Sequence, residues 1–268
     1  METNCETAVV CLSGGMDSTS LLMNLLAAGK KVYGMSFDYG QKHRIELNRL
    51  RANLDYLKSN GLDVEWTLLD LSKLGELFHS ALTDPNWDVP EGHYEQENMK
   101  ETVVPNRNAI FASIAYGYAL SLSAKSKQSV EFCLGVHSGD HAIYPDCRPE
   151  FYDALIAAFE AGNWDADQVK LYLPYLHFDK LVILQDAAKA IEKLGLDFET
   201  VFRNTCTSYM PDAEGRSHGL TGSDVERILA FHEFGVPDPV DYQKPWEAVV
   251  NAAKKLAERY GLATDGHG

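Results

Sequence analysis

The chain has 268 residues, of which 45% are hydrophobic and 24% charged, a composition typical of a globular protein with one sizeable core. Its formal net charge of −15 argues against a nucleic-acid partner, because phosphate backbones attract basic surfaces. The chain contains no run of about 18 apolar residues, so the sequence predicts no membrane span. The acidic first residues are unlike the basic start of a signal peptide. We therefore expect a cytoplasmic protein with neither a nucleic-acid nor a membrane partner.

The first 140 residues alternate between strand-like and helix-like segments. Short apolar runs predict strands at residues 7–12, 32–37, 64–69 and 129–136. Segments with one apolar face predict helices at residues 17–28, 44–60 and 108–123. Strands separated by helices of this length indicate parallel βαβ units. The predicted fold class is α/β, with a doubly wound, mostly parallel sheet.

The rest of the chain has a different character. Residues 71–104 have no clear period and contain Pro85, Pro90 and Gly92, which predicts either an active-site loop or lid, or a poorly ordered segment. Beyond Pro149 the pattern predicts helices at 150–161, 180–194, 222–234 and 246–260. We predict an α/β nucleotide-binding domain over residues 1–170. Residues 171–268 would form a mostly helical region that completes the substrate site and carries oligomer contacts.

One loop carries the chemistry, the run Ser13-Gly14-Gly15-Met16-Asp17-Ser18 between the first predicted strand and helix. Backbone N–H groups and the positive end of the helix dipole converge there, and two glycines let the backbone approach an anion. The serines can donate hydroxyl hydrogen bonds, and Asp17 can bind magnesium or cap the helix. A plain glycine-rich turn is the alternative interpretation. The motif predicts a phosphate site, although not a Walker A loop, since no Gly-Lys-Ser/Thr follows.

This loop resembles the PP-loop of the ATP pyrophosphatase superfamily. The resemblance implies an adenine nucleotide alpha hydrolase-like fold and a reaction that releases pyrophosphate and leaves AMP on an oxygen of the substrate. Four further segments resemble one branch of that superfamily, the 7-cyano-7-deazaguanine synthases (QueC-like proteins). They are residues 36–43, 104–111, 144–151 and 174–180.

Several of these segments have a physical interpretation of their own. Residues 39–41 follow the second predicted strand, at the carboxyl edge where ligands of open α/β sheets bind. Arg107 and Asn108 lie at a predicted helix start, suited to a phosphate or carboxylate, and a surface salt bridge is the alternative for Arg107. Asp146 could accept two parallel N–H bonds or cap a helix, and Lys180 could reach ATP phosphates or be an exposed helical lysine.

The resemblance implies the following roles. Catalytic residues are Ser13, Asp17, Arg107 and Lys180. ATP binds to Leu12, Ser13, Gly14, Gly15, Asp17, Ser18, Phe37, Gln41, Arg107 and Lys180, and Asp17 binds Mg²⁺. The small-molecule substrate, 7-carboxy-7-deazaguanine, binds to Tyr39, Asn108, Tyr144, Asp146 and Arg148.

The implied reaction is an ATP-dependent ligation in which the acid is adenylated and then attacked by an amine. With ammonia, a second adenylation dehydrates the amide to 7-cyano-7-deazaguanine. The sequence leaves open a protein amine as the acceptor, as in QueC-like conjugating enzymes of antiviral defence. Two other classes stay open, a tRNA-thiolating PP-loop enzyme and a non-catalytic nucleotide-binding module. The resemblance also favours a homodimer.

The sequence departs from the synthases at their structural zinc site. Cys206 matches the first zinc ligand, but the other three positions are His218, Thr221 and Asp224. Threonine is a poor zinc ligand, so we expect no structural zinc. Residues 222–226 instead predict a capped helix start that could replace the metal's structural role. The loss of the zinc ligands indicates a diverged paralogue.

Overall fold

The computed structural model of the chain describes residues 5–42, 44–84, 86–87, 101–139, 144–208, 212 and 214–259. Its centre is one five-stranded sheet in the order β3-β2-β1-β4-β5, and every neighbouring pair is parallel. The strands are β1 (Thr7–Cys11), β2 (Lys31–Asp38), β3 (Glu65–Asp70), β4 (Val130–Cys133) and β5 (Val169–Tyr172). The predicted doubly wound, parallel α/β fold is confirmed.

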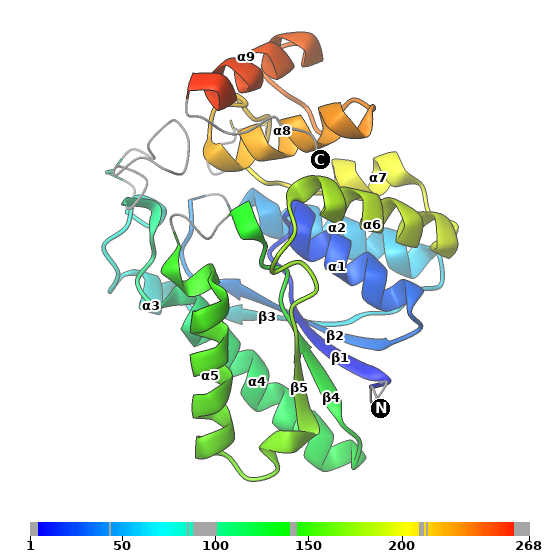
Figure 1. Cartoon of the computed structure of the whole chain (residues 1–268), viewed down its shortest axis with the longest axis vertical. Coiled ribbons are helices and arrows are strands. Elements are labelled where there is room, and N and C mark those ends of the chain that lie inside the picture. The colour runs from blue at the N-terminus through cyan, green and yellow to red at the C-terminus, as the bar shows by residue number, and fades with distance from the viewer. Residues whose placement is uncertain are drawn as a thin grey trace.

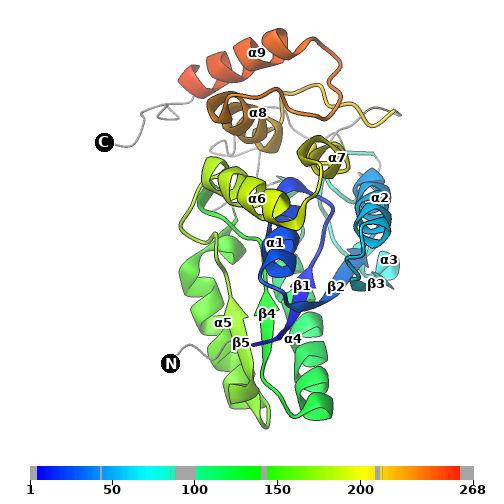
Figure 2. The same cartoon turned by 90° about the vertical axis from the view of Figure 1, so that its right-hand side faces the viewer.

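Helices cover both faces of the sheet (Figures 1 and 2). One face carries α1 (Met16–Ala27), α2 (Ile45–Ser59) and α6 (Lys180–Leu194), and the other carries α4 (Arg107–Ser126) and α5 (Pro149–Gly162). Strand β1 serves both faces by alternation, since Ala8 and Val10 join the first core and Val9 joins the second. Among the described residues lie further helices, α3 (Ser72–Gly75), α7 (Phe198–Arg203), α8 (Gly222–Phe234) and α9 (Trp246–Arg259), and the 3₁₀ turns η3 (Pro145–Cys147) and η4 (Ala166–Gln168).

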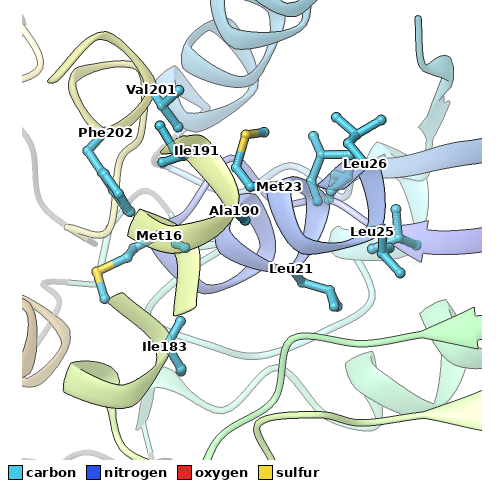
Figure 3. Close-up of a cluster of buried hydrophobic side chains, with 14 of the residues drawn as sticks. Met16, Leu21, Met23, Leu25, Leu26, Ile183, Ala190, Ile191, Val201 and Phe202 are labelled. Carbon is cyan, nitrogen blue, oxygen red and sulfur yellow. The ribbon is translucent and has the colours of Figure 1, made fainter. Parts of the chain in front are cut away.

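The core beside α1 fixes the position of the C-terminal helices. Figure 3 shows Met16, Leu21 and Met23 of α1 close to Ile183, Ala190 and Ile191 of α6, with Val201 and Phe202 of α7 alongside. Leu21, Leu22 and Met23 of α1 are all fully buried, because the helix lies between the sheet and α6. As a result α1 and α6 are held as one packed pair, and the first turn of each lies beside the same cavity.

Helix α6 has clear stop and start signals. The Asp179 side chain accepts a hydrogen bond from Val182 N, and Gly195 ends the helix in a left-handed conformation with φ of 68°. The sequence predicted both ends correctly. Lys180 is the first residue of the helix, so the cap at Asp179 also fixes the position of the Lys180 side chain.

Several elements differ from the sequence prediction. Strand β4 ends at Cys133 and not at residue 136, and Gly135 beyond it packs against the backbone of Asp17. Strand β5 and helix α7 were missed, since four and six residues are too short to show a period. The predicted domain boundary at residue 170 falls inside β5, and the two-domain division stays a prediction. Much of the predicted lid over residues 71–104 lies outside the described residues.

Among the residues that the structure describes, no helix is long and apolar enough to cross a membrane.

Candidate functional site

A cavity of about 250 Å³ opens at the carboxyl ends of β1 and β4. The crossovers after these two neighbouring strands pass over opposite faces of the sheet, which makes this the switch point where open α/β sheets bind ligands. Ten of the predicted site residues line the cavity: Leu12, Ser13, Gly15, Asp17, Ser18, Phe37, Tyr39, Arg107, Asn108 and Lys180.

The loop at residues 13–18 (the PP-loop) is closed by its own hydroxyl groups. Ser13 N donates to Ser18 Oγ at 3.2 Å, the two serine hydroxyls are 3.1 Å apart, and Gly15 N donates to Ser13 Oγ at 3.2 Å. Gly14 has φ of +89°, and a Cβ there would clash with the carbonyl oxygen of Glu46. Helix α1 begins at Met16, within the loop, so its N-terminus faces the cavity. The geometry suits an anionic ligand.

Gly14 does not line the cavity but sets the distance between the PP-loop and α2. We expect Gly14→Ala to cost about 1–2 kcal/mol from the left-handed conformation alone, plus the clash with Glu46, and to weaken ATP binding. Gly29→Ala, at the other end of α1, is the matched control, because Gly29 has φ of +74° and open space around it. Urea unfolding and ATP titration of both variants measure the difference. Equal costs and equal ATP affinities would contradict this role for Gly14.

An ammonium group lies between acidic side chains at the cavity wall. Lys180 is 5% exposed, and its Nζ lies 2.8 Å from Asp17 Oδ2, 2.9 Å from His137 Nε2 and 3.7 Å from Glu226 Oε2. Burial alone would raise the pKa of Asp17, but the charges of Lys180, His137 and Arg227 outweigh it and the net pKa is lowered. Asp17 is therefore ionised at neutral pH, and Lys180 is no exposed lysine.

Asp17 also meets the requirement for a magnesium ligand. Its Oδ1 is buried and has no hydrogen-bond partner in the described part of the chain. Magnesium in nucleotide sites is held by one or two carboxylates together with substrate phosphates, so a single free carboxylate oxygen fits that mode.

Aromatic side chains form part of the cavity wall. The rings of Phe37 and Phe111 stack with centroids 4.2 Å apart, and Tyr39 packs against Phe111 at 5.4 Å. Arg107, the first residue of α4, lies over the Tyr39 ring and donates to its hydroxyl oxygen at 3.3 Å. Asn108 donates to the Asp146 carbonyl oxygen at 3.5 Å. Such a wall can stack on a purine-like ring while Arg107 binds an anionic group.

Not all predicted residues reach the cavity. Gln41 is 1% exposed and lies behind Glu46, to which its Nε2 donates at 3.0 Å. Tyr144 is buried with its hydroxyl 2.8 Å from that of Thr102. Asp146 is half-buried in η3, and the exposed Arg148 precedes α5. Residues 140–143, next to this group, lie outside the described residues.

The cavity also contains residues that the sequence did not single out. They are Glu46, Phe111, Thr207 and Ser223 on its lining, with His137 and Glu226 in contact with Lys180. His137 follows the end of β4, at the sheet edge where ligands bind, and that position was the one available signal. Glu226 comes from α8, about 200 residues from the PP-loop in sequence, and no local pattern predicts its approach.

Cys11, Cys147 and Cys206 also line the cavity. Burial raises the pKa of Cys11 and of Cys206 to about 12. Both thiols are therefore protonated at neutral pH, and a thiol in that state is a weak nucleophile.

The side chains at three positions that match zinc ligands, His218, Thr221 and Asp224, form hydrogen bonds within the protein. Thr221 and Asp224 form a capping box at the start of α8, which confirms the predicted capped helix. Ser208 Oγ donates to Asp224 Oδ2 at 3.2 Å, and His218 Nδ1 accepts from Leu220 N at 3.0 Å. Within the described residues, no group of three or more His, Cys, Asp or Glu side chains could hold a metal ion.

Comparison with known proteins identifies relatives along most of the chain. A family model described as "Queuosine biosynthesis protein QueC" matches residues 7–235. The 7-cyano-7-deazaguanine synthase 1 of Colwellia psychrerythraea is 42% identical over 239 residues, which cover 89% of this chain and 99% of that protein. The 7-cyano-7-deazaguanine synthase of Caldicellulosiruptor saccharolyticus is 42% identical over 236 residues, covering 88% of this chain and 95% of that protein.

Among solved structures, a 4-thiouridine synthetase–RNA complex with bound ATP aligns with 97% of this chain and 54% of its own at 17% identity and a TM-score of 0.43, a likeness too low to carry an argument. The sequence relatives and the family model agree with each other and with the PP-loop at residues 13–18. The chain therefore belongs to the QueC family of PP-loop proteins.

Proposed function

We propose that this protein is an ATP-dependent ligase that adenylates 7-carboxy-7-deazaguanine and transfers the acyl group to an amine. The observation that carries the proposal is the cavity itself, in which the PP-loop and Lys180 face an aromatic wall with Arg107. The curated relatives support it, since they are named 7-cyano-7-deazaguanine synthases and nearly their whole length is matched.

The side chains divide the work as follows. The hydroxyl and N–H groups of the PP-loop bind ATP phosphates, and Lys180 stabilises the charge that develops as pyrophosphate leaves. Asp17 would hold Mg²⁺, which supplies further neutralisation of phosphate charge when bound. Arg107 orients a carboxylate, and Phe37 with Phe111 stacks on a purine-like ring. Catalysis rests on positioning and electrostatics, because adenylation needs no side-chain nucleophile.

The acceptor is the finer part of the proposal. With ammonia the product is an amide, which a second adenylation dehydrates to the nitrile. With a protein amine the product is a conjugate, the reaction expected of an antiviral-defence paralogue. We propose that the capped, zinc-free start of α8 distinguishes this paralogue, since Ser223 in that turn lines the cavity. A homodimer and a cytoplasmic location complete the proposal.

Product analysis tests the function directly. Purified protein is incubated with Mg²⁺-ATP, 7-carboxy-7-deazaguanine and ammonium, and AMP, amide and nitrile are measured by mass spectrometry. We expect AMP formation that depends on the acid, followed by amide or nitrile. Pyrophosphate release and a retained acyl adenylate, with AMP appearing only when a candidate acceptor protein is added, would assign a conjugating enzyme. Absence of pyrophosphate, acyl adenylate and AMP with this acid would overturn the proposal and favour a non-catalytic nucleotide-binding module.

Two of the three cysteines that line the cavity argue against the thiolating alternative. Sulfur transfer to tRNA requires a reactive thiolate, and burial keeps Cys11 and Cys206 protonated. The net charge of −15 is also unfavourable to tRNA binding.

A further inference from the structure

A second carboxyl group in the cavity has no part in the adenylation described above. Glu46, in the first turn of α2, lines the cavity and is 9% exposed. Its own carbonyl oxygen abuts Gly14, so the residue is fixed beside the PP-loop. Glu46 therefore lies next to the site where the proposed adenylate forms.

The buried amide of Gln41 holds the Glu46 carboxyl in place. Gln41 Oε1 accepts from Tyr39 N at 2.9 Å, while Gln41 Nε2 donates to Phe37 O at 3.3 Å and to Glu46 Oε1 at 3.0 Å. Because an amide oxygen accepts and an amide nitrogen donates, the contact with Tyr39 N fixes which end of the amide faces Glu46. Gln41 is thus a positioning residue for Glu46, and it holds the Glu46 carboxyl at a site that is largely shielded from solvent.

The groups around Glu46 give it an unusual acidity. Burial raises the pKa of Glu46 to about 8, against the opposing effects of the Gln41 hydrogen bond and the Arg107 charge. In the described part of the chain, the titratable and charged groups that face it include Arg107 from α4, Cys206 from the segment after α7, and Tyr39 from the segment after β2. The thiol and the phenol are neutral at neutral pH, since burial raises the pKa of both. Glu46 can therefore gain or lose a proton near neutral pH.

We propose that Glu46 is the general base of the second half-reaction and takes the proton that the amine loses as it attacks the acyl adenylate. This inference rests on the proposed function. In the step, the amine nitrogen forms a bond to the acyl carbon, and the bond from that carbon to the AMP oxygen breaks. The electron pair of the broken bond leaves on the phosphate of AMP, and one proton passes from nitrogen to a Glu46 carboxylate oxygen.

The chemistry of this step explains why an ordinary carboxylate would serve poorly. A nitrogen that has just attacked an acyl carbon carries a positive charge and must lose a proton before the product is stable. A glutamate at its usual pKa of 4.5 is a weak base for that proton. A general base is most effective when its pKa lies near the working pH, and burial brings Glu46 there.

The test separates the two half-reactions in Glu46→Gln, a variant of nearly the same shape. Adenylation is measured as acid-dependent exchange of pyrophosphate into ATP. Acyl transfer is measured as hydroxamate formation with hydroxylamine, a weakly basic amine that is already unprotonated at neutral pH. We expect little change in exchange and a loss of at least about 100-fold in acyl transfer, the lower range for a general base. In the wild type, acyl transfer should rise with pH through about 8, and the variant should lose that rise.

Two control variants and one stability measurement accompany the test. Glu46→Asp keeps a carboxyl and should recover part of the acyl transfer. Asp38→Asn removes a buried carboxylate at the end of β2 that does not line the cavity, and should leave the ratio of the two rates unchanged. The raised pKa predicts that the contribution of Glu46 to stability is fully present below pH 4.5 and is lost as pH rises through about 8, and Glu46→Gln should lack this loss in urea unfolding.

The outcomes distinguish the inference from the proposed function. Equal losses of exchange and acyl transfer in Glu46→Gln would overturn the inference, because Glu46 would then act in binding or in folding. Unchanged acyl transfer would overturn it as well. Wild-type protein that shows no acid-dependent exchange would instead overturn the proposed function, and with it the reaction that Glu46 is assigned to.

Discussion

Replacing Lys180 with methionine is expected to slow adenylate formation by about 100- to 1000-fold, the loss typical of removing one group that stabilises transition-state charge in a dry site. Lys180 is 5% exposed and its ammonium faces the cavity beside the PP-loop. Methionine fills the same space without the charge. The rate is measured as acid-dependent exchange of pyrophosphate into ATP.

The magnitude follows from the surroundings of the ammonium. Asp17 Oδ2 at 2.8 Å and His137 Nε2 at 2.9 Å hold Nζ in one place before ATP arrives, so the charge needs no reorganisation during the reaction. Lys180→Met also leaves Asp17 without its close cation. We therefore expect weaker ATP binding together with the slower chemical step.

Lys189→Met is the matched control for this prediction. Lys189 is on the same helix, its side chain is 77% exposed, and its ion pair with Asp186 spans 3.8 Å. Surface pairs of this kind contribute about 0–1 kcal/mol, so the control should keep both fold and exchange rate. Near wild-type exchange in Lys180→Met would show that the phosphate charge is stabilised by other groups.

The fold could be predicted because local pattern and tertiary environment agree over most of the chain. Val9 and Val10 lie in an apolar run that only a strand buried on both faces requires, and the glycines that follow it end that strand. The short edge strand β5 (Val169–Tyr172) alternates over four residues only, which no window of useful length can separate from a loop. The length of each helix or strand therefore decided whether the sequence pattern could predict it.

The site could be predicted to the extent that its residues lie in short sequence motifs. Asp17 and Lys180 came from separate motifs, and the packing of α1 against α6 brings them to 2.8 Å. Glu46 reads as one polar residue on an amphipathic helix, and its burial depends on how closely Gly14 approaches α2. The approach of Gly14 to α2 is a tertiary contact, which no local sequence pattern predicts. The contacts of Lys180 with His137 and Glu226 are likewise set by loops and helices far apart in sequence.

Arg227→Met should reduce the free energy of unfolding by about 3–5 kcal/mol, the cost of leaving a buried charge without its partner. Arg227 is 1% exposed, and its guanidinium binds both carboxylate oxygens of Asp238, at 2.6 and 2.9 Å. The other N–H groups reach Thr205 Oγ1 at 2.7 Å, Thr207 Oγ1 at 2.9 Å and Phe202 O at 3.3 Å. The substitution therefore strands a carboxylate and several acceptors at once. Urea unfolding measures the loss.

The same network can close the C-terminal region without the zinc site that the sequence predicts to be absent. Arg227 joins α8 to the segment containing Cys206, whose N–H donates to the Gly14 carbonyl oxygen at 2.9 Å, and so connects α8 to the PP-loop. Arg203→Met is the control, since its pair with Glu199 is exposed and worth about 0–1 kcal/mol. Should Arg227→Met fail to fold, Asp238→Asn keeps the shape of the network and removes its charge. A chelator should leave the melting temperature of the wild type unchanged. Melting that falls on chelation, or an Arg227→Met cost no larger than that of Arg203→Met, would mean that a metal and not this ion pair holds the region together.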